Sequence, residues 1–166
     1  DRFILSRYGA TAAAVLRGYD DYDYSGIFQT LNQFLTVDLS AFYADVSKDR
    51  LYTFASNSPE RRSAQTAMYV MADGLARLLA PILPVTSDEL WRHLPASAAA
   101  TAGKPAEREA SVHVATFPRD VAALVDADVD ARWMRLREVR DEVNRAILGS
   151  ATMASGERRT VRIKIE

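Results

Sequence analysis

Two short basic runs, separated by a polar turn, contain the residue types best suited to contact an anionic polymer. The first run is Lys-Asp-Arg at 48–50, and the second is the pair Arg61 and Arg62. Guanidinium and ammonium groups hold backbone phosphates, and an aromatic ring such as that of Tyr52 offers a stacking surface for an unpaired base. The pattern therefore predicts RNA contact by a set that we call the basic corner: Lys48, Arg50, Tyr52, Arg61 and Arg62.

Composition leaves a second interpretation of this corner open. A Lys-Asp-Arg run is often a solvated surface whose charges pair with one another, and Asp49 is placed to bridge Arg61 or Arg62. The net charge of the whole chain is −1, so any affinity for nucleic acid must come from local clustering.

The other polar residues form no arrangement typical of catalysis or metal binding. The sequence has no cysteine and no glycine-rich phosphate loop of the G-x-G-x-x-G or G-x-x-x-x-G-K type. His93 and His113 lack metal-ligand spacing, so a surface or hydrogen-bonded role is favoured for both. The remaining candidates are helix caps or hydroxyls without a neighbouring base: Asp20, Asp21, Asp23, Ser40 and Ser63. We expect no metal site and no catalysis by this chain alone.

A second group of cations lies near the C-terminus and favours a structural role. Its five arginines alternate with acidic residues at helical spacing, as in the i,i+4 pair of Asp141 with Arg145, which is typical of ordinary helix stabilisation. Trp91 and Trp133 both fall on apolar faces, where core packing is favoured over base stacking. The arginines are Arg132, Arg135, Arg137, Arg140 and Arg145.

These residues need helices to position them, and the apolar spacing indicates an antiparallel all-α bundle of about five helices. We expect a bundle domain over 1–148 and a C-terminal extension of unknown role over 149–166, with a strand-like pattern near its end. A solvated loop is predicted at 95–111, followed by a short extended segment. The other predicted elements are helices over 2–20, from about 25 through 46, from 59 to the prolines at 81 and 84, from 86 through 94 and from 128 to 149, with the extended segment at 112–117.

Several local signals place the boundaries of these helices. Ser58 and Pro59 form a typical helix start, and Thr-Ser-Asp-Glu at 86–89 resembles a capping box. Val85 and Leu90 are placed to pack against each other as a hydrophobic staple across that start. In the second helix, the predicted buried stripe includes Leu35, Leu39, Phe42 and Val46.

The ordered motifs of the chain resemble those of the isoleucyl-tRNA synthetases, which are class I aminoacyl-tRNA synthetases. The resemblance covers roughly residues 1–148 and falls in the helical domain that follows the catalytic core. The valyl and leucyl enzymes share only the Ala-Pro-Ile and Glu-x-Trp parts. The motifs are Asp-Leu-Ser-Ala-Phe-Tyr at 38–43, Lys-Asp-Arg-Leu-Tyr at 48–52, Arg-Arg-Ser-Ala-Gln-Thr at 61–66, Leu-Ala-Pro-Ile-Leu-Pro at 79–84, Glu-Leu-Trp at 89–91 and Ser-Val-His-Val with Phe-Pro within 111–118.

This resemblance implies an anticodon-binding domain that docks the anticodon stem and loop of isoleucine tRNA in the cytoplasm. The whole enzyme would be a monomeric ligase that uses ATP and Mg²⁺. Its ATP motifs and editing domain have no counterpart in this sequence, so we expect the chain to be a fragment. Zinc would belong only to a C-terminal module that this cysteine-free sequence does not contain. Asp38, Ser40 and Phe42 would serve packing and helix–helix hydrogen bonds, and Asp49 would orient a neighbouring arginine.

Two other classes of protein compete with this interpretation. A helical protein-interaction module would need a large exposed apolar patch, and a five-helix bundle could bury every stripe that the sequence shows. A free-standing helical enzyme would need a catalytic constellation. The sequence has no run of about 18 apolar residues, so it predicts no membrane-spanning segment.

Overall fold

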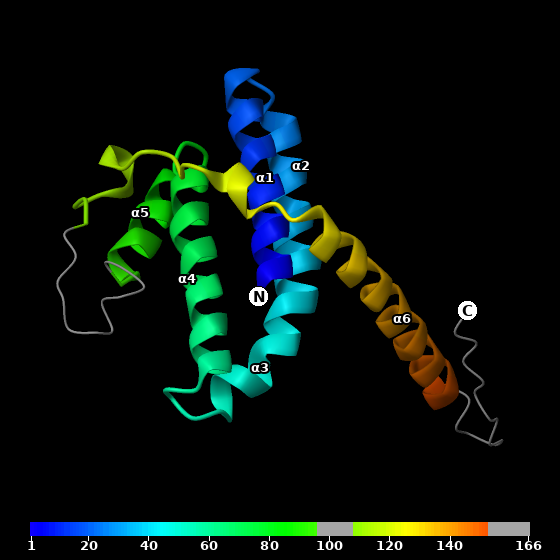
Figure 1. Ribbon diagram of the computed structural model, residues 1–166. Coiled ribbons are helices and arrows are strands. Elements are labelled where there is room, and N and C mark those ends of the chain that lie inside the picture. Colours follow the sequence, from blue (N-terminus) through cyan, green and yellow to red (C-terminus); the bar gives the residue numbers. More distant parts are fainter. Residues whose placement is uncertain (96–107, 153–166) are drawn as a thin grey trace. The chain divides into compact units, whose positions relative to one another are not determined.

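The computed structural model describes residues 1–95 and 108–152, with side chains described as far as residue 147. These residues form helices joined by turns, and the described ranges contain no strand (Figure 1). The all-α class with about five helices is confirmed, since three consecutive helical segments form one continuous rod. The chain divides into two compact units, Asp1–Asp126 and Ala127–Glu166, which we describe separately.

The first unit begins with a helical hairpin. Helix α1 spans Arg2–Asp20 and is followed by a rod made of α2 (Tyr24–Gln33), the π-helix η1 (Phe34–Ala44) and α3 (Asp45–Tyr52). The reversal between them uses Tyr22 in the left-handed region, at φ 57°. Asp23 caps α2 by accepting a hydrogen bond from the Gly26 amide at 2.9 Å, which confirms the expectation that this aspartate is a helix cap.

The π-helix η1 changes which face of the rod is buried. Its hydrogen bonds reach one residue further than those of an α-helix, so each turn contains more residues. From the start of η1 to the end of α3, the buried positions are Phe34, Asp38, Phe42, Tyr43 and Ser47. The predicted stripe is therefore wrong in part: Phe42 is buried, Leu35 and Leu39 are half-buried, and Val46 is exposed.

Helix α4 spans Pro59–Leu79 and begins as predicted. The Ser58 hydroxyl accepts a hydrogen bond from the Arg61 amide at 3.2 Å, and Pro59 occupies the first helical position. The helix ends before Pro81, because proline has no amide hydrogen to continue the helical hydrogen bonds. Ile82, which lies between the two prolines at the predicted end of this helix, is beyond the helix and exposed.

Helix α5 spans Pro84–His93, and its start differs from the prediction. Pro84 takes the first helical position because its ring fixes φ at a helical value, so the helix begins before the expected capping box. Thr86 lies inside the helix, and no side chain caps it. Val85 and Leu90 are both exposed, so the predicted staple is wrong.

The core of the first unit lies between α1, the rod and α4. Two ring pairs join α1 to η1: Phe3 meets Phe42 edge-on at 5.8 Å, and Tyr8 meets Phe34 at 6.2 Å. The Tyr8 hydroxyl lies directly over Gly74, where a Cβ atom would overlap it. The other buried hydrophobic residues around these pairs are Ile4, Ala12, Val15, Ile27, Leu31, Tyr43, Ala64, Ala67, Met71, Leu75 and Leu78.

A smaller core lies around Trp91. The indole is 2% exposed and makes cation–π contacts with two guanidinium groups, with the Cζ atom of Arg108 3.3 Å and that of Arg77 4.9 Å from the ring centroid. Asp73 pairs with both arginines. The prediction that Trp91 packs in the core is confirmed. Arg108 is 10% exposed, so the prediction of a solvated loop over 95–111 is wrong at this residue. The part of that predicted loop at 96–107 lies outside the described residues.

Residues 111–117 run along α5 and α4, but not as a strand. Val112–Val114 form the 3₁₀ turn η3, and extended backbone begins only at Ala115, so the predicted extended segment is wrong over its first half. Asp88 on α5 causes this turn, because its carboxylate accepts hydrogen bonds from the Ser111 hydroxyl and the Val112 amide. Val112 thereby packs beside Trp91.

The chain then returns to the start of α1 through the 3₁₀ turn η4, Val121–Leu124. The Val121 carbonyl lies against Gly9, where any side chain would collide with it. Asp126 donates its amide hydrogen to the Ser6 hydroxyl at 2.8 Å and pairs with Arg2 at 2.6 Å. We call the contacts of Asp126 with Ser6 and Arg2 the terminal clasp.

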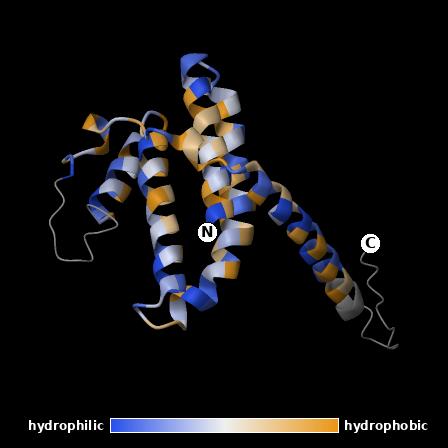
Figure 2. Ribbon diagram, viewed as in Figure 1, coloured by the Kyte–Doolittle hydropathy of each residue, from blue (hydrophilic) through white to orange (hydrophobic). Residues whose placement is uncertain are grey.

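The second unit is built on α6, Ala127–Thr152. Hydrophobic and hydrophilic residues alternate along it (Figure 2). The helix begins one residue before the predicted start at Asp128 and continues past Gly149 to Thr152, so the predicted C-terminal end is wrong. Trp133 is half-buried. The predicted boundary near 148 falls within this helix, and the strand-like tail lies outside the described residues.

No helix in the described part of the chain combines the length and the hydrophobicity needed to cross a bilayer.

Candidate nucleic-acid interface

The turn between α3 and α4 brings the two predicted basic runs to one end of the first unit (Figure 1). Lys48 and Arg50 lie on the last turns of α3, and Arg61 and Arg62 lie on the first turn of α4. The two helices pack against each other. The positive end of the α4 dipole points into this turn, which favours an anion, and Arg50 complements the negative end of α3.

Three members of the basic corner are exposed. Tyr52 is 82% exposed, and the side chain of Lys48 is 63% exposed while pairing with Asp45 at 3.1 Å. Arg62 is also exposed. A ring and two cations can therefore reach an external partner without breaking any buried contact of Tyr52 or Lys48.

Arg50 belongs to the frame of the corner. Its side chain is 26% exposed, and its guanidinium grips the Asp1 carboxylate through both terminal nitrogens, at 3.0 and 2.9 Å. The same carboxylate accepts hydrogen bonds from the Tyr43 hydroxyl at 2.7 Å and the Ser63 hydroxyl at 2.5 Å. Burial raises the pKa of Tyr43, so this hydroxyl stays protonated and available as a donor.

Asp1 is a residue that the sequence-based interpretation missed. It lies 49 positions from Arg50, and no local spacing connects the two. The expected role of Asp49, to orient a neighbouring arginine, falls to Asp1 in the case of Arg50.

Arg61 shapes the turn itself. Its Nη1 atom donates to the Phe54 carbonyl oxygen at 2.9 Å, and its amide donates to Ser58. Its Nε atom is buried and has no hydrogen-bond partner among the described residues. Arg61 therefore closes the α3–α4 turn and contributes less to the outer surface than Arg62.

Of the three motif residues on η1 that were expected to pack, two are buried and one is exposed. Asp38 is 3% exposed and accepts a hydrogen bond from Arg7 of α1 at 3.2 Å, as the packing interpretation expected. Phe42 is buried against Phe3. Ser40 is exposed, so the expected packing role for its side chain is wrong.

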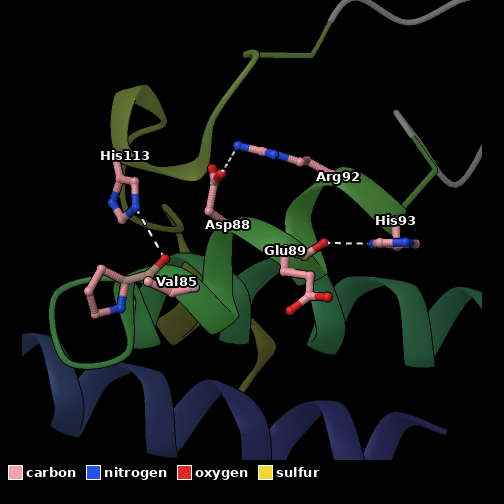
Figure 3. Close-up of a pocket in the computed structure, with 7 residues that line it drawn as sticks. Val85, Asp88, Glu89, Arg92, His93 and His113 are labelled. Atoms are coloured by element: carbon pink, nitrogen blue, oxygen red, sulfur yellow. Dashed lines mark hydrogen bonds and ion pairs between the residues drawn. The ribbon is translucent and has the colours of Figure 1, made fainter.

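A groove of about 580 Å³ on α5 is the other candidate site (Figure 3). His93 Nδ1 lies 2.8 Å from the Glu89 carbonyl oxygen, and His113 Nε2 lies 3.2 Å from that of Pro84. Since a carbonyl oxygen only accepts, both nitrogens act as donors, which supports the prediction of hydrogen-bonded histidines. The lining residues are Pro84, Val85, Asp88, Glu89, Arg92, His93 and His113.

Asp88, one of the two acidic residues that line this groove, already has partners. The Ser111 hydroxyl, which donates to Asp88, lowers the pKa of that carboxyl, and Arg92 pairs with it at 2.6 Å. The described residues contain no cluster of three or more histidine, aspartate or glutamate side chains able to hold a metal ion. The groove therefore serves to anchor residues 111–112 on α5.

The fold and the site together define this molecule as an all-α domain with an exposed basic turn. A family model described as the anticodon-binding domain of tRNA ligase matches residues 1–163, and the chain belongs to this family. The predicted membership is thereby confirmed.

The particular relatives are isoleucine–tRNA ligases. The chain is 40% identical to that of Moorella thermoacetica over 147 residues, which cover 89% of this chain and 15% of the relative. It is 42% identical to that of Symbiobacterium thermophilum over 143 residues, or 86% and 14% of the two chains. The enzyme of Geobacillus kaustophilus is 37% identical over 147 residues, again 89% and 15%. The chain thus spans about 15% of the length of the curated relatives it matches.

Proposed function

We propose that this chain is the anticodon-binding domain of an isoleucine–tRNA ligase and that it docks the anticodon stem and loop of isoleucine tRNA. Family membership and the isoleucine–tRNA ligase relatives support the proposal. The structural observation that carries it is the α3–α4 turn, where Lys48, Tyr52 and Arg62 are exposed on a frame held by partly buried side-chain contacts.

The exposed side chains have distinct tasks in this proposal. Lys48 and Arg62 contact phosphates of the RNA backbone, which fix the register of the domain on the stem. Tyr52 stacks on an unpaired base of the loop, because its ring is almost fully exposed. Arg50 and Arg61 hold the turn in shape, and Arg61 adds positive charge at its rim.

The role of the domain is to position the tRNA, and the chemistry belongs to other parts of a longer protein. In that protein, ATP with Mg²⁺ would activate isoleucine before its transfer to the tRNA. The catalytic and editing domains would be intramolecular partners, and zinc would belong to a C-terminal module. We propose that the whole enzyme is monomeric and cytoplasmic.

The competing interpretations have less support. The three relatives compared above are isoleucine enzymes rather than valyl or leucyl ones. A protein-interaction module without RNA binding would not account for membership of an anticodon-binding family.

The first test is binding of the chain to isoleucine tRNA across a salt series. We expect Arg62→Ala and Lys48→Ala each to weaken binding about fivefold at low salt, as the loss of one charged hydrogen bond would do. Each substitution should also reduce the slope of log affinity against log salt by about one.

The matched control is Arg17→Ala. Arg17 is an exposed arginine near the far end of α1, away from the α3–α4 turn (Figure 1). Equal affinities and equal salt slopes for Arg17→Ala and Arg62→Ala would reject the proposed interface. Comparison of isoleucine tRNA with a non-cognate tRNA then shows whether the chain reads bases or only phosphates.

A further inference from the structure

We propose that Asp1 is a positioning residue for RNA binding by the basic corner, although its side chain is negatively charged. This inference rests on the proposed function. It assigns to Asp1 the task of holding the α3–α4 turn in the shape that presents Lys48, Tyr52 and Arg62 to an RNA backbone and base.

The geometry places one carboxylate at the junction of three helical segments. Asp1 precedes α1 and accepts hydrogen bonds from Tyr43 at the end of η1, from Arg50 on α3 and from Ser63 on α4. The pair with Arg50 is bidentate, which fixes the direction of the guanidinium as well as its distance. The side chain of Asp1 is 14% exposed, so water competes little for these bonds.

These contacts act on the basic corner from both of its helices. Arg50 lies two residues from both Lys48 and Tyr52 on α3, and Ser63 follows Arg62 on α4. A single carboxylate therefore links the helical turn that carries the first basic run to the turn that carries the second. Without it, the two runs keep their charges but lose a shared anchor.

The direction in which RNA affinity changes when the Asp1 charge is removed distinguishes a positioning role from simple electrostatic repulsion. A carboxylate close to a phosphate-binding surface repels the ligand, so its removal should tighten binding if charge were its only influence. A positioning role predicts weaker binding instead, because without Asp1 the side chains of Lys48, Tyr52 and Arg62 are no longer held in one arrangement. Exposed Asp49, inside the first basic run, provides a matched carboxylate for comparison.

The experiment compares Asp1→Asn with Asp49→Asn in binding of isoleucine tRNA at low salt. We expect Asp1→Asn to weaken binding about tenfold and Asp49→Asn to leave it unchanged or to tighten it. Circular dichroism and thermal unfolding establish that each variant is folded at the temperature of the assay. Tighter or unchanged binding by folded Asp1→Asn would overturn the inference.

A double-mutant cycle measures the coupling between Asp1 and Arg62 in RNA binding, which a general loss of stability would not change. If Asp1 positions Arg62, the effect of Arg62→Ala should shrink from about fivefold to less than twofold in the Asp1→Asn background. Full additivity of the two substitutions would contradict positioning.

Ser63→Ala provides a milder variant in case Asp1→Asn does not fold. It removes only the bond from Asp1 to α4, and we expect a twofold to threefold loss of affinity. An unchanged affinity in folded Ser63→Ala would then reject the inference. Failure of the proposed function looks different: Arg62→Ala and Arg17→Ala would be indistinguishable, whatever Asp1→Asn does.

Discussion

Arg50 and Arg62 carry the same side chain in very different surroundings. Arg50 is fixed by a bidentate carboxylate and the Ser47 hydroxyl, while Arg62 is exposed on the first turn of α4. A buried ion pair that loses one partner leaves an uncompensated charge, so substitution of Arg50 disturbs the frame as well as any RNA contact. We therefore expect substitution of Arg50 to lower the stability of the fold as well as any RNA binding.

Tyr8 gives a prediction about pH at the residue scale. Burial, and then the charge of Asp73, raises the pKa of Tyr8 from its ordinary 10.0 to about 12. Below pH 10 the hydroxyl is protonated in both the folded and unfolded states. Between pH 10 and 12 the unfolded chain loses this proton first, so the free energy of unfolding falls as the pH rises.

The measurement is urea unfolding of the wild type and Tyr8→Phe at neutral pH and across this alkaline range. We expect the loss of stability on raising the pH to be smaller by about 2 kcal/mol in Tyr8→Phe, since one pKa unit corresponds to about 1.4 kcal/mol. Equal losses in the two proteins would show that Tyr8 does not couple folding to this titration.

Ser58 gives the prediction at the scale of the element. Its hydroxyl satisfies the Arg61 amide at the start of α4, which is the helix that contains two of the five residues of the basic corner. We expect Ser58→Ala to reduce the free energy of unfolding by about 1 kcal/mol, whereas Ser58→Asp should retain most of it because aspartate also caps well. Chemical denaturation of the three proteins tests this order, and equal stabilities would show that the cap contributes nothing.

The elements also show how far sequence reasoning reaches. Apolar periodicity and the cap at Ser58 predict α1 and the start of α4, because both depend on neighbouring residues. The π-helix η1 has no equivalent local signal, so the predicted stripe through Leu35 and Val46 is displaced from the buried face. The location of the basic corner was predictable. The anchoring of Arg50 by Asp1 was not, because it depends on tertiary contact across 49 residues.

At the scale of the whole molecule, the first unit has a hydrophobic core of its own, and its last residues pack against its first helix. Its hydrophobic residues surround Tyr8 and Phe34, and residues 121–126 close on α1. We therefore predict that a chain ending at Asp126 folds alone, with a single cooperative thermal transition and the circular dichroism of a helical protein. A broad transition without a cooperative midpoint would contradict this.

The same shortened chain locates the RNA-binding residues. Because the basic corner lies wholly within residues 1–126, the shortened chain should retain the salt-dependent part of tRNA binding that Arg62→Ala removes. Complete loss of binding in a folded shortened chain would assign the interface to α6 and its five arginines instead.

The terminal clasp determines how mechanical load passes through the first unit. Arg2 and Asp126 are in direct contact, so the polypeptide enters and leaves this unit at neighbouring points. Tension applied at the N-terminal end would load the clasp and, through Asp1, the α3–α4 turn as well, because Arg50 and Ser63 are bonded to the Asp1 carboxylate. Mechanical load on that end of the unit would therefore reach the basic corner directly.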